Sequence, residues 1–93
     1  MSRRRADERF VVSANIAHRE IGGKLLLLLP DDTRLYAFNE TGRLVWRGVL
    51  RKSSSATIAA SMARKFRIPL ARAERDVGDL LGDLLRRGVI RRV

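Results

Sequence analysis

The sequence predicts an α+β domain: a three-stranded antiparallel sheet followed by a three-helix bundle with the outline of a winged helix-turn-helix. Up to Phe38 the apolar residues alternate or run together as in strands, and after it they recur at helical spacing. A chain of 93 residues suffices for one modest core. Residues 1–9 have no periodicity and are expected to form a mobile basic arm, and residues 10–93 form the domain.

Three strands are expected to build the sheet. Residues 16–21 alternate apolar and polar side chains, as a half-buried strand does, and Gly22-Gly23 offers the positive φ angles of a tight hairpin. The return strand, 24–29, contains five consecutive leucines, which indicates burial on both faces and a central position. A proline and two aspartates over 30–33 are typical of a turn. The third strand, 34–38, follows this turn.

The first helix is expected after Phe38, with Asn39 or Thr41 as its N-cap. Its outer side carries the basic stripe Arg43, Arg47 and Arg51, whose members recur every four residues. The inward side is expected to comprise Leu44, Val45, Trp46 and Val49.

Two more helices are expected, separated near Pro69 because the residue before a proline avoids the α region. A serine among residues 53–55 caps the second helix. The third runs over about 70–87 and ends at Gly88. The apolar stripe of the second helix is Ile58, Met62 and Phe66, and that of the third is Ala73, Val77, Leu80, Leu81 and Leu84. Residues 10–12 and 89–93 are candidates for additional short strands.

Composition excludes several kinds of function. With no cysteine and one histidine, the chain lacks disulfides and the ligands of a Cys/His zinc site, and nothing indicates a cofactor. Its longest apolar run, 25–29, is far too short to cross a bilayer, so we expect a cytoplasmic protein without membrane contact. His18 has no thiol partner and the serines at 53–55 have no evident base, so we expect no catalytic residues and no enzyme.

The net charge of +10 makes a winged helix-turn-helix DNA-binding regulator the alternative function. In that geometry the third helix would enter the major groove. Residues 68–85 carry four acidic and two basic side chains, which argues against nucleic acid as the partner. The basic surplus lies instead in 40–67 and at the two ends of the chain, and the stripe Arg43, Arg47 and Arg51 is either a solvated face or a dock for an acidic protein surface.

The third strand, 34–38, lies at the edge of the expected sheet, where a second extended chain could pair with it. The third helix contains Gly78 and Gly82, which weaken a helix by about 1 kcal/mol each relative to alanine. These glycines either let another backbone approach closely or pack the first helix against the third.

Two segments resemble the PqqD-like family. LYAFNETGRLVW, residues 35–46, is similar to its strand, Leu-Asn-x-Thr-Gly, helix and Trp signature, and DVGDLLGDLLRRGVI, residues 76–90, resembles its closing helix. Phe38 stands where the family commonly has Leu, and Leu80 where Phe is frequent. The usual Asp-Gly after the first helix is replaced at 51–53 by Arg-Lys-Ser, which leaves the end of that helix open.

The resemblance implies a peptide-binding function. PqqD-like domains act as RiPP recognition elements: they bind the leader segment of a ribosomally synthesised precursor peptide by β-strand addition and present it to modifying enzymes. By this resemblance, Leu35, Tyr36, Ala37 and Phe38 form the edge, and Asp76, Val77, Asp79, Leu80, Asp83 and Leu84 line or rim the cleft. We favour the flank of the third helix that carries Asp76, Leu80 and Asp83, whose carboxylates suit a leader with Lys or Arg.

The implied partners are the precursor peptide and a modifying enzyme such as a leader peptidase, a cyclase or a radical-SAM enzyme. A lasso-peptide and a PQQ-type pathway both fit, and the basic stripe with the missing Asp-Gly favours the lasso or another non-PQQ type. An open strand edge also permits a homodimer.

Overall fold

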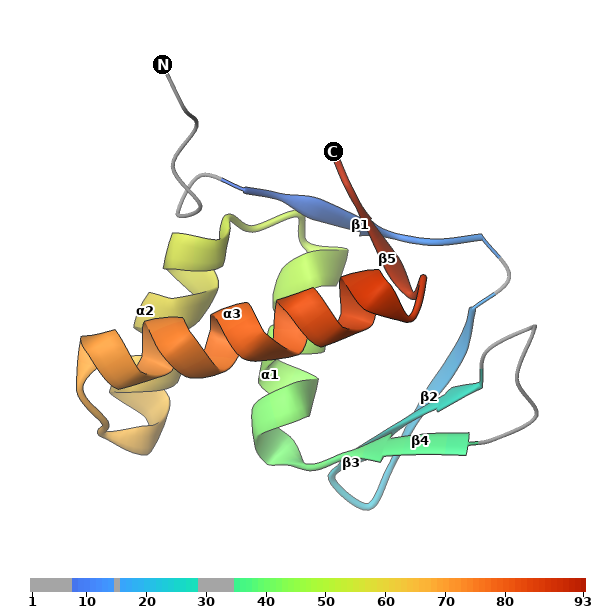
Figure 1. Ribbon diagram of the computed structural model, residues 1–93. Coiled ribbons are helices and arrows are strands. Elements are labelled where there is room, and N and C mark those ends of the chain that lie inside the picture. Colours follow the sequence, from blue (N-terminus) through green and yellow to red (C-terminus); the bar gives the residue numbers. More distant parts are fainter. Residues whose placement is uncertain (1–7, 15, 29–34) are drawn as a thin grey trace.

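The computed structural model describes residues 8–14, 16–28 and 35–93 (Figure 1). The elements are β1 (Phe10–Val12), β2 (Ala17–Ile21), β3 (Lys24–Leu28), β4 (Leu35–Phe38), α1 (Glu40–Leu50), α2 (Ser55–Phe66), α3 (Leu70–Arg86) and β5 (Ile90–Arg92). The predicted α+β order of strands before helices is confirmed, whereas the winged helix-turn-helix outline stays a prediction. The turn expected over 30–33 and the arm residues 1–7 lie outside the described residues.

The strands form two separate sheets. β2, β3 and β4 make the antiparallel three-stranded sheet, with β3 in the centre as predicted. β1 pairs instead with β5, so that Phe10 lies opposite Arg92. Figure 1 shows this ribbon beside the C-terminal end of α3, away from the larger sheet. The ribbon ties the two ends of the domain together.

The two residues before β1, Glu8 and Arg9, contact the rest of the domain. The Ser55 amide donates to the Glu8 carbonyl at 2.9 Å, and the Val93 amide donates to the Arg9 carbonyl at 3.0 Å. The Glu8 carboxylate lies 2.6 Å from Arg92 Nε. Contacts with the rest of the domain therefore begin at Glu8. The basic arm expected before the domain stays a prediction.

The larger sheet is covered on one face only. Leu25 and Leu27 of β3 are fully buried, but Leu26 is half-buried and Leu28 is 44% exposed. The prediction that β3 is buried on both faces is therefore wrong. The prediction of a half-buried β2 is also wrong, because every residue of β2 is exposed. The physical reason is that α1 is the described helix that packs on this sheet, and it covers the Leu25 face.

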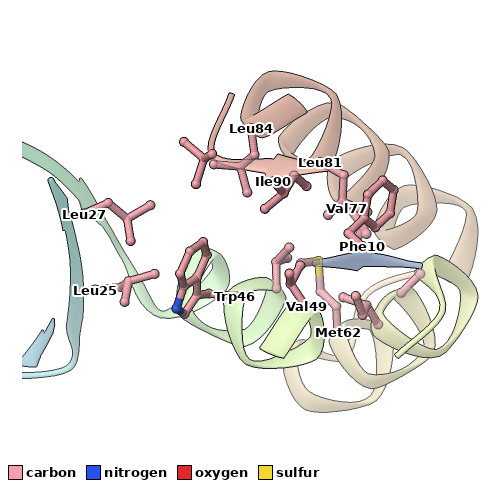
Figure 2. Close-up of a cluster of buried hydrophobic side chains, with 14 of the residues drawn as sticks. Phe10, Leu25, Leu27, Trp46, Val49, Met62, Val77, Leu81, Leu84 and Ile90 are labelled. Atoms are coloured by element: carbon pink, nitrogen blue, oxygen red, sulfur yellow. The ribbon is translucent and has the colours of Figure 1, made fainter. Parts of the chain in front are cut away.

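Trp46 of α1 connects the sheet to the helical core (Figure 2). Its side chain is 1% exposed and lies between the buried leucines of β3 and the cluster formed by the three helices. Within the described residues its indole Nε1 has no hydrogen-bond partner. The helical part of the core comprises Val45, Val49, Ile58, Ala59, Met62, Ala73, Val77, Leu81 and Leu84, with Phe10, Val89 and Ile90 from the terminal segments.

The predicted helix starts and the end of the third helix are confirmed within one residue. Asn39 Oδ1 accepts the Gly42 amide at 3.2 Å and so caps α1, and Ser54 Oγ accepts the Thr57 amide at 3.2 Å and caps α2. Pro69 precedes α3. Gly88 follows it with a φ of +73°, a left-handed conformation that favours glycine.

Candidate functional site

The site expected from the sequence is the edge of β4 together with one flank of α3. Among the described strands, β4 pairs only with β3, which leaves its second edge without a strand neighbour. Ala37 is exposed on this strand and Phe38 is half-buried. An exposed, short edge strand of this kind offers main-chain groups to an added peptide.

The hairpin between β2 and β3 determines which main-chain groups point where. Gly22 and Gly23 both have positive φ angles, +58° and +79°, as in a type I′ turn. The flanking residues Ile21 and Lys24 are then the hydrogen-bonded pair that closes the two-residue turn. Lys24 therefore directs its N–H and C=O toward β2.

The direction of the Lys24 main-chain groups also determines the directions along β3 and β4. Hydrogen-bonded and non-bonded pairs alternate along an antiparallel ladder, so Leu25 and Leu27 direct their main-chain groups toward β4. Their register partners Phe38 and Tyr36 consequently bond inward to β3. Ala37, which lies between them, directs its N–H and C=O to the free edge. The sequence left these two directions open, and the register with the turn type decides between them.

On α3, the sequence-predicted residues fall into three groups. Val77 and Leu84 are buried in the core, whereas Leu80 is half-buried at its margin. At about 100° per residue, Asp76 and Asp83 lie next to Leu80 on one flank. Val77 and Leu84 thus support the helix from inside, and Leu80 is the apolar residue that this flank presents.

The carboxylates of this flank have partners on the same helix. Asp83 lies 2.9 Å from Arg87 Nε and 3.6 Å from Arg86, and Asp76 lies 3.7 Å from Arg72 Nε. These ion pairs are exposed, so they are weak individually, but they offset the negative charge of the flank. The acidic rim is therefore less negative than the count of aspartates indicates.

Asp79 faces away from the core, about 40° around the helix from Asp83 at 100° per residue. It also lines a groove of about 840 Å³ between α3, α2 and β1, together with Gly78 and Gly82. Among the described residues, a Cβ on Gly78 would meet nothing within 4 Å, and one on Gly82 would meet only the Arg86 side chain at 3.5 Å. The alternative that these glycines pack the first helix against the third is therefore wrong.

Close helix packing occurs at two other glycines, both in α1. A Cβ on Gly48 would lie 2.5 Å from Ile58 Cγ1 of α2, and one on Gly42 would lie 2.5 Å from Phe38 Cβ. Gly42 thus fixes the approach of α1 to the end of β4. The sequence did not predict this role of Gly42. The only indication of it is the presence of this glycine within the segment 35–46.

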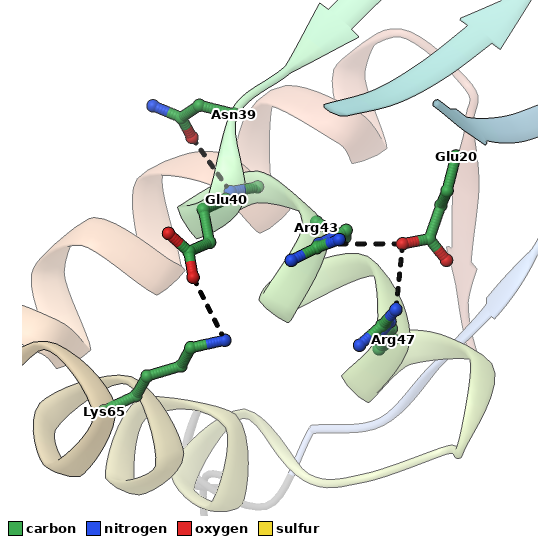
Figure 3. Close-up of polar contacts among 7 residues, drawn as sticks. Glu20, Asn39, Glu40, Arg43, Arg47 and Lys65 are labelled. Carbon is green, nitrogen blue, oxygen red and sulfur yellow. Dashed lines mark hydrogen bonds and ion pairs between the residues drawn. The ribbon is translucent and has the colours of Figure 1, made fainter. Parts of the chain in front are cut away.

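The basic stripe of α1 has a carboxylate partner that the sequence did not reveal (Figure 3). Glu20 of β2 accepts a hydrogen bond from Arg47 Nη2 at 3.0 Å and lies 3.6 Å from Arg43 Nε. The register pairs Glu20 with Leu25, which places Glu20 on the face of the sheet that α1 covers. Two of the three arginines of the stripe therefore pair with a carboxylate of the chain, while Arg47 and Arg51 stay exposed.

The described residues contain no cluster of three or more His, Cys, Asp or Glu that could hold a metal ion. None of the helices in these ranges is long and apolar enough to span a membrane.

Two solved structures share this architecture. A lasso peptide synthetase B1 complexed with the leader peptide matches with a TM-score of 0.80 at 22% identity, covering 88% of this chain and 96% of that one. TbiB1 in complex with the TbiA(beta) leader peptide matches with a TM-score of 0.78 at 16% identity, covering 85% and 92%. At these identities the likeness concerns the fold. A comparison with the curated proteins finds no significant match.

The family comparison covers most of the chain. The model described as coenzyme PQQ synthesis protein D (PqqD) matches residues 24–90, which include the larger sheet from β3 onward, all three helices and the first residue of β5. This span contains both segments that carried the resemblance, 35–46 and 76–90. The chain therefore belongs to the PqqD family.

Proposed function

We propose that this protein binds the leader segment of a ribosomally synthesised precursor peptide and presents it to a modifying enzyme. The observation that carries the proposal is the free edge of β4, where Ala37 directs its main-chain groups outward. The two solved structures compared above are both complexes with leader peptides, which supports the same kind of ligand here.

The peptide would join the sheet as a fourth strand beside β4. Leu35 has the same main-chain direction as Ala37, because the ladder alternates every residue, so these two residues supply donors and acceptors to the added strand. Alternate side chains of the peptide would then face the flank of α3. No Cα of α3 comes within 8 Å of one of β4 in the described ranges, so strand addition requires no main-chain contact to be broken.

The flank of α3 would select side chains at these alternate positions. Leu80 is its apolar contact, and Asp76 and Asp83 stand beside it. Because both carboxylates already have arginine partners, we propose that apolar contact at Leu80 contributes more to affinity than attraction of Lys or Arg. Asp79 also lines the groove beside α2 and β1, so it would contribute less to leader binding than Asp76 and Asp83.

The protein would act by binding and not by catalysis. In the proposed pathway a separate enzyme, such as a leader peptidase or a cyclase, modifies the presented peptide. The likeness to a lasso peptide synthetase B1 favours a lasso-type pathway over the PQQ type.

Fluorescence anisotropy with the labelled precursor peptide of the same gene cluster tests the proposal. We expect saturable binding with a dissociation constant of roughly 0.1–10 μM, retained at about 150 mM salt. A duplex DNA titrated in parallel should bind only electrostatically and lose affinity steeply over the same salt range. No saturation with the cognate leader, or a sequence-specific DNA complex that survives at this salt, would contradict the proposal and favour the regulator.

A further inference from the structure

A second concave surface lies between α1 and α2. It is a groove of about 470 Å³, which we call the cationic groove, lined by Arg43, Leu44, Arg47, Gly48, Arg51, Ser53, Thr57, Ile58, Ser61, Arg64 and Lys65. Its lining includes five basic side chains and, among the described residues, no acidic one. Five basic side chains therefore gather at one place on the surface.

Cations from both walls of this groove already pair with carboxylates of the chain itself (Figure 3). Glu20 lies 3.0 Å from Arg47 and 3.6 Å from Arg43, and Glu40 lies 3.3 Å from Lys65. These contacts join β2 to α1 and α1 to α2, and they show that cations of the groove can pair with a carboxylate. The positions of these cations therefore allow them to bind a carboxylate.

Two cations of the groove have no such partner. Arg51 and Arg64 are exposed, and in the described part of the chain neither makes an ion pair. Arg51 comes from the end of α1 and Arg64 from the last turns of α2, so both helices contribute a free guanidinium to the same groove. Hydroxyl groups of Ser53, Thr57 and Ser61 line it with them and can donate to an anion.

The shape and lining favour an acidic polypeptide over nucleic acid. Single strands are held largely by stacking of bases on aromatic side chains, and no aromatic residue of the described ranges lines the groove. A duplex is a wide convex rod, which meets protruding helices or strands more readily than a groove between two packed helices. Side-chain carboxylates can enter such a groove and pair with arginine in bidentate geometry.

We propose that the cationic groove docks an acidic segment of a partner protein through Arg51 and Arg64. None of its lining residues belongs to β4 or α3, so the surface is separate from the proposed leader site. A partner held here would leave the edge of β4 free. The inference does not depend on leader binding, and each can fail without the other.

Two measurements on the full chain test it, with octaglutamate as the probe. In anisotropy titrations at low salt, Arg51→Glu/Arg64→Glu should weaken binding by about tenfold or more. The matched control is Arg75→Glu/Arg91→Glu, which makes the same change in net charge at two exposed arginines outside the groove. Since it alters only the overall field, the control should weaken binding by about threefold at most.

Amide chemical shifts of the wild-type protein on adding octaglutamate give the second test. The shifts should concentrate at Arg51, Ser53, Thr57 and Arg64 and leave β4 and α3 unchanged. Equal loss of affinity in the two double variants would mean that only net charge matters, and shifts outside the groove would place the probe elsewhere. Either result overturns the proposal, as does tighter groove-dependent binding of a DNA oligonucleotide than of octaglutamate.

Discussion

Replacing Ala37 by proline should remove leader binding while the protein stays folded. The N–H of Ala37 points to the free edge of β4, so proline deletes a donor that β3 does not use and places its ring in the path of the added strand. We expect the dissociation constant for the leader to rise about tenfold to hundredfold, or about 1.4–2.8 kcal/mol. Anisotropy with the labelled leader measures the affinity, and circular dichroism reports the fold.

Two further variants separate this effect from general damage. Tyr36→Pro removes a donor that bonds inward to β3, so it should destabilise the sheet and lose binding for that reason. Ala37→Gly keeps the outward N–H and should retain most of the affinity. If Ala37→Pro binds the leader as the wild type does, the peptide does not add to β4.

Trp46→Ala should have the largest effect on stability. The indole is 1% exposed and fills the space between the leucines of β3 and the helical core, so its removal leaves a cavity where the two parts of the domain meet. Loss of a buried tryptophan costs about 3–5 kcal/mol, a large fraction of the stability of a small domain. Urea denaturation followed by circular dichroism measures this loss.

Trp46→Phe is the matched control. Phenylalanine keeps a ring in the same space and removes the buried Nε1 donor, which has no partner among the described residues. The gain from removing an unsatisfied donor offsets part of the lost contact area, so the cost should stay below about 1.5 kcal/mol. Equal destabilisation by alanine and phenylalanine would show that ring packing is not the main contribution of Trp46.

Local signals predicted most of the fold. The Gly22-Gly23 turn, the Asn39 cap and the stop at Gly88 each have a physical cause within a few residues, and all three are confirmed. The position of β4 at the edge followed from the same local order of strands. Predicting the direction of the Ala37 N–H also requires the register between β3 and β4, and no local signal in the sequence sets that register.

Long-range contacts account for what the sequence did not predict. The pairing of β1 with β5 joins opposite ends of the chain, and two three-residue strands carry too little pattern to indicate each other. The five leucines were expected to be buried on both faces, but burial depends on how many helices cover the sheet, and α1 covers one face. Likewise, nothing in the basic stripe itself indicates that Glu20 pairs with Arg43 and Arg47.

Hydrogen exchange at the Ala37 amide, followed by NMR with and without the cognate leader, tests strand addition most directly. In the free protein this amide faces the open edge and should exchange quickly, while the amides of Tyr36 and Phe38 are protected by β3. Saturation with leader should slow exchange at Ala37 selectively and leave the pattern at its two neighbours unchanged. Continued fast exchange at Ala37 in the saturated complex would contradict the account, because an added strand must satisfy that donor.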